Sequence, residues 1–267
     1  MMLIKIGGGK KNNLEYICND IKTLIDQGEK VVLVHGASVT RDELAEKLGV
    51  PTKTIISPSG ISSVFTDTDA IDVFLMAYPG IVNKKIVAKL QSYRVNAVGL
   101  SGIDGQLWRG KRKTAVYSKE GEKTKLITNN MSGKVTDINI NLILLLLDNK
   151  YVPVVCPPAL SEENEIINTD NDWAAAVMAG ALHIEKMIVL FEAPGLLKKF
   201  GDESSVIKKV DKTKLDECFT YTQGRMKKKL LGAKEVFRLG LKKLYWSDGR
   251  IKNPIFKALK GEGTVIS

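Results

Sequence analysis

Apolar runs of strand length alternate with helical patterns along almost the whole chain, and this alternation restricts the fold more than any other feature. Eight runs are typical of buried strands, at residues 2–6, 30–34, 53–56, 96–100, 151–155, 186–190, 242–245 and 264–266. Helical periodicity covers residues 14–25, 40–48, 69–77, 138–147, 173–182 and 226–239. Strands that alternate with helices form a mainly parallel sheet covered on both faces. We therefore expect an α/β fold.

One region interrupts the alternation, and a second boundary divides the chain. Residues 106–135 are expected to form β-hairpins laid over one edge of the sheet, with turns at Glu120-Gly121 and near Asn129-Asn130. A less distinct boundary near residue 184 predicts two lobes, residues 1–183 and residues 184–267, and each lobe is expected to bind one ligand.

Length and composition narrow the class of protein. With 267 residues, 44% of them hydrophobic, the chain can bury a large core as one α/β domain or two lobes that share a sheet. Its longest uninterrupted apolar stretch, Leu142 to Leu147, is far shorter than the roughly 20 residues of a membrane span. The first strand starts at residue 2 without a signal peptide, so we expect a cytoplasmic protein.

The cysteines and histidines do not form a metal-binding pattern. Three cysteines lie far apart without a C-x-x-C pair, and the chain has only two histidines. A structural zinc site normally needs four such ligands close together. We expect buried free thiols and no metal held by the protein alone, so that any Mg²⁺ arrives with a nucleotide, held by phosphate oxygens and water.

Lys and Arg are spread through the chain, whose net charge is +10, but several of them crowd one stretch. Arg109, Lys111, Arg112 and Lys113 are followed by three further lysines at positions 119, 123 and 125. A solvated hairpin explains this stretch, and so does a docking patch for an acidic protein. Nucleic acid is a weaker alternative, because the stretch has no basic motif interleaved with aromatic residues.

Two strands end in small residues, which predicts a phosphate site. Lys5 precedes Gly7 and Gly8 at the end of the first strand, and Gly36-Ala37-Ser38 follows the second strand. Glycines let backbone N–H groups approach an anion, and the carboxyl ends of parallel strands are where open sheets bind ligands. Plain turns are the alternative for each segment taken singly. Neither segment is a Walker A loop or a G-x-G-x-x-G motif.

Two helix starts carry further candidates. Asp170 or Asn171 is expected to cap the helix that follows, which leaves Asn168 to hold a polar substrate group and Asp172 to orient lysine side chains. The segment from Gly224 to Lys229 places three consecutive lysines at a helix N-terminus. Cations there oppose the helix dipole, and an anionic ligand would offset that cost.

Two loops after later strands are candidates for a nucleotide pocket, or they merely connect elements. Glu192, Gly195 and Leu196 follow one strand, and Trp246 and Ser247 follow another. The chain has no Ser/His/Asp set and no H-E-x-x-H motif. Lysines, glycines and one well-placed acid suit phosphoryl transfer, in which an enzyme mostly positions groups and stabilises negative charge.

Taken together and in order, these segments resemble the amino acid kinase family, in its N-acetylglutamate kinase branch. The similarity covers the whole chain and is strongest to kinases that act on aminoadipate or glutamate attached to the carrier protein LysW. It implies a three-layer α/β/α sandwich, a homodimer, ATP with Mg²⁺, and formation of an acyl phosphate on a side-chain carboxylate. The acidic substrate would bind in the N-terminal lobe and ATP in the C-terminal lobe.

The resemblance also implies roles for individual residues. Lys5 and Lys229 match the lysines that neutralise the phosphoryl group during transfer, and Asp172 matches the aspartate that organises them. Asn168 matches a substrate-binding asparagine. The glycines Gly8 and Gly36 match positions whose amides hold phosphate or substrate carboxylate, and Met226 belongs to the G-x-M-x-x-K segment.

Three departures from the family pattern affect the substrate and nucleotide positions. Ala37-Ser38 stands where a third glycine run is usual, Val64 where an arginine grips the substrate's carboxylate, and Phe191-Glu192 where a T-D pair contacts nucleotide. Loss of an arginine removes a bidentate contact, so the substrate can differ. The sequence favours a LysW-borne acidic substrate, with N-acetylglutamate as the alternative within the same chemistry and a non-catalytic nucleotide-binding or amino-acid-binding regulator as the alternative outside it.

Overall fold

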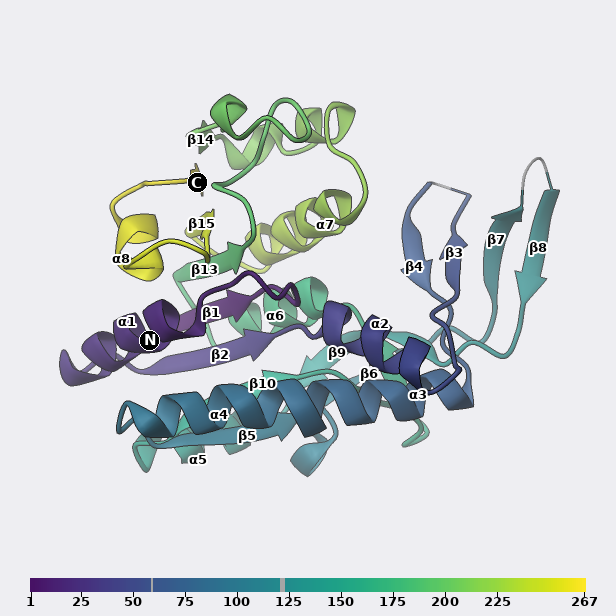
Figure 1. The fold of residues 1–267 in the computed structure, drawn as a ribbon, viewed down its shortest axis with the longest axis horizontal. Coiled ribbons are helices and arrows are strands. Elements are labelled where there is room, and N and C mark those ends of the chain that lie inside the picture. The colour runs from purple at the N-terminus through teal and green to yellow at the C-terminus, as the bar shows by residue number, and fades with distance from the viewer. Residues whose placement is uncertain (59, 121–122) are drawn as a thin grey trace.

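The chain folds around one eight-stranded sheet with the strand order β14-β16-β15-β13-β1-β2-β10-β5 (Figure 1). The computed structural model describes residues 1–267 except residues 59 and 121–122. Neighbouring strands are parallel apart from β15 and β16. The strands are β1 (Met2–Ile6), β2 (Val31–His35), β5 (Ala97–Ser101), β10 (Val152–Cys156), β13 (Lys186–Phe191), β14 (Lys209–Val210), β15 (Lys243–Asp248) and β16 (Thr264–Ile266).

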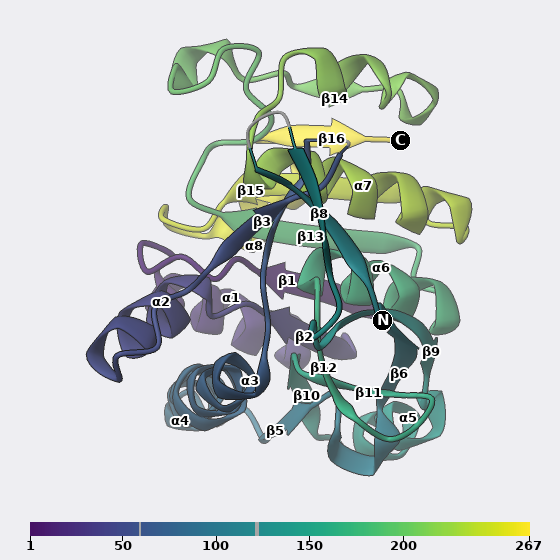
Figure 2. The ribbon, with the colours of Figure 1, turned by 90° about the vertical axis from the view of Figure 1, so that its right-hand side faces the viewer.

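Helices cover both faces of this sheet. One apolar cluster joins the sheet to α1, α4 and α8, and another joins its opposite face to α5, α6 and α7. Figure 2 shows α1, α4 and α8 on one side of the central strands and α5 and α6 on the other. The expected three-layer α/β/α sandwich is therefore confirmed. The helices are α1 (Leu14–Asp26), α2 (Ser38–Lys47), α3 (Thr68–Leu75), α4 (Asn83–Ser92), α5 (Ile140–Asp148), α6 (Asn171–Ala181), α7 (Arg225–Arg238) and α8 (Pro254–Leu259).

Burial on both faces explains the continuous apolar runs. Every residue of β1 and β2 is buried, and β1 includes the side chain of Lys5, which is 1% exposed. A parallel strand inside such a sandwich has no solvent-facing side, so its sequence does not alternate. The three cysteines are free and buried, as the sequence predicts.

The helix expected over residues 69–77 does not end there. A π-helical segment, Met76–Val82, joins α3 directly to α4 and contains Pro79. Proline lacks an N–H and clashes with the preceding turn of an α-helix. The wider π turn accommodates it, so the proline marks an irregularity rather than the end of the helix.

The apolar run at residues 53–56 was expected to be a strand of the central sheet, and this prediction is wrong. The run forms β3 (Thr54–Ile56), which pairs only with β4 (Ser62–Val64) in an antiparallel hairpin among the described strands. A second hairpin, β7 (Val116–Glu120) with β8 (Lys123–Ile127), projects beside it, away from the body of the molecule (Figure 1). Short, exposed strands of this kind have too little apolar surface to join the core.

Within residues 106–135 an antiparallel hairpin forms as expected, between β7 and β8, but it projects away from the sheet, and the flanking strands differ from the expectation. The strands β6 (Trp108–Arg112) and β9 (Ser132–Ile138) close a small barrel with β11 (Ala159–Ser161) and β12 (Ile166–Thr169). No hairpin turn forms at Asn129-Asn130, because Asn130 is fully buried and its side-chain carbonyl accepts a hydrogen bond from the backbone N–H of Thr66. The turn predicted at Glu120-Gly121 extends outside the described residues.

The proposed division near residue 184 falls between strands of one continuous sheet, since β13 pairs with β1 in parallel register. The carboxyl ends of β1, β2 and β13 consequently lie side by side. None of the described helices combines the length and the apolar character that a membrane span requires.

Candidate active site

Two lysines that are distant in the sequence bind the same carboxylate. Lys5 Nζ lies 2.7 Å from Asp172 Oδ1, and Lys229 Nζ lies 3.1 Å from both Asp172 oxygens. Lys5 comes from β1, Asp172 from the first turn of α6, and Lys229 from the first turns of α7. The structure thus brings together the three residues that the sequence analysis assigned to catalysis.

Helix capping and close helix packing position this triad. Asp170 is the N-cap of α6 and accepts hydrogen bonds from the N–H groups of Asp172 and Trp173, as the sequence predicts for one residue of this segment. Gly232 brings α7 against α6, because a Cβ there would lie 3.1 Å from the carbonyl oxygen of Asp172. Side-chain bulk at this glycine would push Lys229 away from the carboxylate.

The triad holds one more positive charge than negative charge in a buried place. Burial lowers the pKa of Lys5 to about 8, although the carboxylate of Asp172 opposes this shift. Burial alone would raise the pKa of Asp172, but the ammonium groups of Lys229 and Lys5 outweigh it and hold the pKa below its usual value. Such a site attracts an anion that completes the neutralisation of its charge. The aromatic ring of Phe191 lies under Lys229, with Nζ 5.4 Å from the ring centroid.

The glycine loops after β1 and β2 are in direct backbone contact beside this triad. A Cβ built on Gly8 would lie 2.5 Å from the amide nitrogen of Ser38 and 2.7 Å from that of Ala37. One on Gly36 would lie 2.9 Å from the amide nitrogen of Gly8. Several backbone N–H groups therefore surround one small region, which is the arrangement that binds phosphate or carboxylate groups in proteins.

Replacing Gly8 with alanine is expected to weaken both the fold and anion binding. The new methyl group would collide with backbone atoms of residues 36–38, which cannot rotate away as a side chain can. We expect the midpoint of thermal unfolding to fall by several degrees and the Kd for ATP to rise about tenfold or more, measured by calorimetry. Gly80→Ala is the matched control, because its nearest contact is an ordinary 3.4 Å. Equal effects of the two substitutions would contradict the role of the Gly8 contact.

The loop after β13, which was predicted to line a nucleotide pocket, contains a contact that the sequence did not indicate. The carboxylate of Glu192 accepts a hydrogen bond from the N–H of Lys11 and lies against Gly9, where a Cβ would be 2.4 Å from Oε1 and 2.6 Å from Oε2. Gly7 donates its N–H to the carbonyl oxygen of Leu190 at 2.8 Å, so this amide is already used within the protein. Glu192 and the glycine loop after β1 therefore form one unit.

Other predicted nucleotide residues lie in the protein interior. Leu196, Trp246 and Ser247 are each at most 1% exposed, and Leu196 and Trp246 pack in the main apolar cluster. Gly195 lies against Thr264, whose Oγ1 accepts a hydrogen bond from the N–H of Leu196 at 2.8 Å. The prediction that Trp246 and Ser247 lie in a loop after a strand is wrong, because both belong to β15 and their side chains are part of the protein interior. Met226, which is half-buried, packs at the edge of the same cluster.

The predicted substrate residues lie around the barrel strands and α2. Asn168 on β12 donates a hydrogen bond from Nδ2 to Thr66 Oγ1 at 2.9 Å. Ala37 and Val64 belong to one small apolar cluster with Phe74 and Tyr78. Position 64, where an arginine is usual in the family, is thus an apolar packing position in this chain.

Arg225 contacts the loop after β2, where substrate-binding residues were predicted, and was missed by the sequence analysis. Its Nη1 donates a hydrogen bond to Ser38 Oγ at 3.1 Å, and its Nη2 lies 3.9 Å from Asp42 Oδ2. The two contacts join α7 to α2 across 187 positions of sequence. The preceding Gly224, with φ of 54°, allows the chain to turn into α7 at this point.

The basic patch predicted from the sequence is partly neutralised. Arg109 donates hydrogen bonds to Gln106, Asn164 and two backbone carbonyls, and Arg112 Nη1 lies 2.7 Å from both carboxylate oxygens of Glu165. Lys111 Nζ is 3.9 Å from Glu162. These contacts hold β6 to the neighbouring β11–β12 loop. Of the four predicted residues, Lys111 and Arg112 make ion pairs, whereas Arg109 and Lys113 make none among the described residues.

Comparison with known proteins agrees with this geometry. The profile of the amino acid kinase family matches residues 1–245. LysW-aminoadipate kinase from Thermus thermophilus is 42% identical over 268 residues, covering 100% of both chains. Its counterpart from Deinococcus radiodurans is 43% identical and covers 100% of this chain and 91% of the relative. LysW-aminoadipate/LysW-glutamate kinase from Sulfolobus acidocaldarius is 32% identical over the full length of both chains.

Solved structures show the same fold. The crystal structure of smu.665 from Streptococcus mutans matches with a TM-score of 0.81 and 23% identity, covering 100% of this chain and 98% of the other. Carbamate kinase from Giardia lamblia matches with a TM-score of 0.66 and 15% identity, covering 99% and 97%. From its sequence profile and its full-length relatives, the chain belongs to the amino acid kinase family.

Proposed function

We propose that this protein transfers the γ-phosphoryl group of MgATP to the side-chain carboxylate of an amino-blocked acidic amino acid. The observation that carries the proposal is the pair of ammonium groups, Lys5 and Lys229, on the one carboxylate of Asp172. They lie at the sheet edge where the loops after β1 and β2 present their backbone N–H groups. Full-length relatives named as kinases support the same reaction.

The residues of the site suit each stage of this transfer. A phosphoryl group in flight spreads negative charge over its oxygens, and two fixed ammonium groups stabilise that charge. Asp172 keeps them in place without neutralising both. The acceptor is a carboxylate that is already ionised at neutral pH, so the reaction needs no general base. Bound Mg²⁺ would neutralise part of the charge on the ATP phosphates, which, with water, are its proposed ligands.

We further propose that the acceptor is aminoadipate or glutamate attached to LysW, as the names of the relatives indicate for those proteins. The substrate would lie near Asn168 and the Gly36-Ala37-Ser38 loop, and ATP near the loop after β1 and Glu192. An acidic carrier would meet the basic stretch mainly through Lys113 and the lysines of the β7–β8 hairpin, because Arg109 and Arg112 are engaged within the protein. Because ATP is the donor, we propose a cytoplasmic location.

A homodimer completes the proposal. The β5 strand forms one edge of the sheet, and no described strand pairs with its outer side. On the adjacent α5, Leu145 is 60% exposed and Leu144 is 37% exposed. An open edge beside apolar side chains favours pairing with a second copy of the chain.

Trapping of the acyl phosphate tests the reaction and its acceptor. Protein, MgATP and hydroxylamine are incubated with LysW-borne aminoadipate, LysW-borne glutamate or free N-acetylglutamate, and hydroxamate is measured. We expect hydroxamate with a carrier-borne substrate and little with N-acetylglutamate. Equal activity on free N-acetylglutamate would assign the alternative substrate. ATP binding without hydroxamate from any acceptor would instead favour a non-catalytic regulator, for which the altered Ala37-Ser38, Val64 and Phe191-Glu192 positions are the motivation.

A further inference from the structure

The imidazole of His35 is a buried titratable group to which the proposed reaction gives no role. His35 is the last residue of β2, directly before the Gly36-Ala37-Ser38 loop, and it is fully buried. Its Nδ1 lies 3.2 Å from the carbonyl oxygen of Gly36, and its Nε2 lies 3.1 Å from Nδ2 of Asn83. Asn83, also fully buried, is the first residue of α4. Both ring nitrogens therefore have a partner within hydrogen-bond distance.

These two partners select one form of the ring. A carbonyl oxygen can only accept, so Nδ1 of His35 carries the proton and Nε2 accepts from the amide of Asn83. The orientation of that amide is itself fixed, because Asn83 Nδ2 also donates to the carbonyl oxygen of Val154 at 2.9 Å. The contacts thus hold His35 as the neutral Nδ1–H tautomer.

A glycine of β5 leaves the space that the Asn83 amide occupies. A Cβ on Gly99 would lie 1.9 Å from Asn83 Oδ1, and Gly99 pairs with Val154 in the sheet. Lys84 Nζ donates to the carbonyl oxygen of Gly99 at 3.2 Å and to Asn83 Oδ1 at 3.4 Å. Two strands and the start of α4 therefore fix Asn83, and Asn83 in turn fixes the ring.

The surroundings also keep the ring uncharged. Burial lowers the pKa of His35 to about 4, and the positive charges of Lys5 and Lys84 add to this shift. The hydrogen bond to the carbonyl oxygen of Gly36 opposes it. At neutral pH the imidazole is consequently a fixed donor rather than a source of protons.

The hydrogen bond of His35 sets the direction of the peptide between residues 36 and 37. The C=O and N–H of a trans peptide point opposite ways, so the N–H of Ala37 points away from the imidazole. It donates to the hydroxyl group of Tyr78. Burial raises the pKa of Tyr78, and the charge of Arg41 and this hydrogen bond from Ala37 both oppose the shift. The peptide is thus held from both sides.

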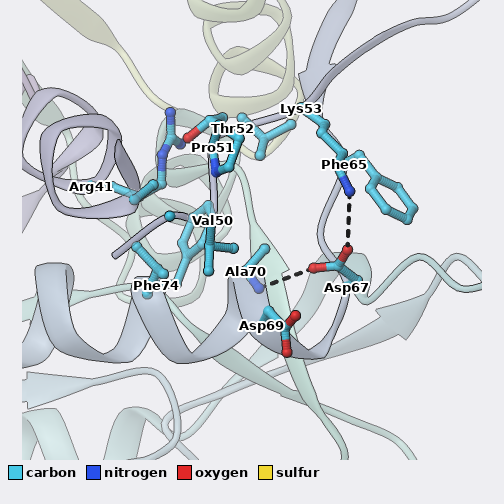
Figure 3. A pocket seen from close by; sticks show the side chains of 14 residues that line it. Arg41, Val50, Pro51, Thr52, Lys53, Phe65, Asp67, Asp69, Ala70 and Phe74 are labelled. Carbon is cyan, nitrogen blue, oxygen red and sulfur yellow. Dashed lines mark hydrogen bonds and ion pairs between the residues drawn. The ribbon is translucent and has the colours of Figure 1, made fainter. Parts of the chain in front are cut away.

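The same segment begins α2 and, with it, one wall of a cavity. The carbonyl oxygen of Ala37 accepts a hydrogen bond from the N–H of Arg41 at 2.8 Å. Arg41 of α2 and Phe74 of α3 line a cavity of about 150 Å³ (Figure 3). Val64, one of the predicted substrate residues, lines it too. A shift of the peptide before α2 would therefore move this wall.

The arrangement leaves the backbone N–H of Ser38 free. Ser38 is the first residue of α2, and its N-cap, Ala37, has no side-chain hydrogen bond to offer. Within the residues that the structure describes, the Ser38 N–H makes no hydrogen bond. Its nitrogen faces the close contact with Gly8, where a Cβ would be 2.5 Å away. A free N–H at a helix start suits an oxygen atom of an anion.

We propose that His35 is a positioning residue of the phosphoryl-transfer site. As the neutral imidazole fixed by Asn83, it orients the peptide between residues 36 and 37 so that the N–H of Ser38 faces the acidic acceptor. This inference rests on the proposed function, which assigns the loop after β2 to the acceptor. His35 touches no reacting atom and acts through the backbone. ATP binding depends on it less, because the loop after β1 has contacts of its own, such as the hydrogen bond from Gly7 to Leu190.

A matched pair of variants separates positioning from packing. In His35→Asn, the amide nitrogen can stand where Nδ1 stands and donate to Gly36, whereas leucine in His35→Leu has the shape of asparagine without a donor. Both variants lose the acceptor for Asn83. We expect kcat/KM for the acceptor to fall about tenfold or more in His35→Leu and at most about threefold in His35→Asn. KM for ATP should stay within about threefold in both. Hydroxamate formation measures these constants.

Ring-nitrogen NMR of protein with isotope-labelled histidine tests the tautomer without any substrate. The chain has two histidines, so His183→Asn assigns the signals. It is also the control, and it should leave kcat/KM unchanged, because His183 has φ of 51° and asparagine adopts this conformation readily. We expect His35 to keep its proton on Nδ1 alone from about pH 5 to pH 8, above its pKa of about 4. Asn83→Leu, which removes the donor to Nε2, should bring the Nε2–H form into the spectrum.

Three results would overturn the proposal. They are equal kinetic losses in His35→Asn and His35→Leu, a loss confined to the midpoint of thermal unfolding, and a proton on Nε2 of His35 in the unmodified protein. If His35→Leu does not fold, Asn83→Leu takes its place, and kcat/KM for the acceptor should fall. If the unmodified protein forms no hydroxamate from any acceptor, the proposed reaction fails. The ring-nitrogen spectrum and the calorimetric Kd for the acceptor in the two variants then still decide the role of His35.

Discussion

Replacing Lys5 or Lys229 with methionine is expected to lower kcat by about 10²–10³, the usual effect of losing one donor that stabilises transition-state charge. Methionine has nearly the volume of lysine without its charge, so packing around β1 and α7 is largely kept. KM for ATP should change less than kcat, because the missing charge matters most when negative charge spreads during transfer. Steady-state hydroxamate formation measures both constants.

The control for this prediction lies on the same helix. Lys234 on α7 pairs with Asp216 at 2.6 Å and takes no part in the triad. Lys234→Met should keep kcat within about twofold of the unmodified protein. Unchanged turnover in both Lys5→Met and Lys229→Met would show that the triad has a structural role only.

The largest loss of stability is expected from Asp172→Asn. The substitution leaves two ammonium groups facing a neutral amide in a buried place, and breaking a buried ion pair by removing one partner costs about 3–5 kcal/mol. Lys5 is almost fully buried, so solvent cannot replace the lost carboxylate. Urea unfolding at pH 7 measures the difference in unfolding free energy from the unmodified protein.

The pH dependence of this loss has a defined sign. In the intact protein, burial lowers the pKa of Lys5 to about 8, and the carboxylate of Asp172 opposes this shift. Without that carboxylate the pKa of Lys5 falls further. At pH values between this lower pKa and 8, folded Asp172→Asn binds fewer protons than the folded intact protein. The unfolded states of the two proteins bind the same number of protons in this range. The destabilisation should therefore shrink as the pH rises from 6 to 8, by at most about 1.4 kcal/mol per pH unit. Adding Lys5→Met should abolish this dependence and restore part of the stability; a pH-independent deficit in Asp172→Asn alone would contradict the assigned coupling.

Local sequence signals pointed to Lys5 and Asp172, whereas the resemblance to the amino acid kinase family singled out Lys229 among three consecutive lysines. Lys5 is the charged residue in an otherwise apolar strand, Asp172 follows a capping residue, and Lys229 opens a helix. Parallel strands bring such points to one edge of a sheet, so the convergence follows from topology. The layers of the fold follow from the same alternation of strands and helices.

Contacts that depend on side-chain packing between distant segments were not predictable in this way. The contact of Arg225 with Ser38 depends on how α7 lies against α2, and the contact of Glu192 with Gly9 depends on the path of two loops. Leu196 and Trp246 were both predicted in loops, yet Trp246 lies within β15 and both side chains pack in the core. The burial of Asn130 likewise depends on Thr66, a residue 64 positions away.

A structure of the protein with ADP, aluminium fluoride, Mg²⁺ and the acidic acceptor tests the central claim most directly, because the fluoride complex imitates the phosphoryl group during transfer. We expect Nζ of Lys5 and Nζ of Lys229 both to lie within about 3 Å of its fluorine atoms, the distance of a charge-assisted hydrogen bond. A complex in which either ammonium group stays on Asp172 alone and makes no contact with the fluoride would contradict it.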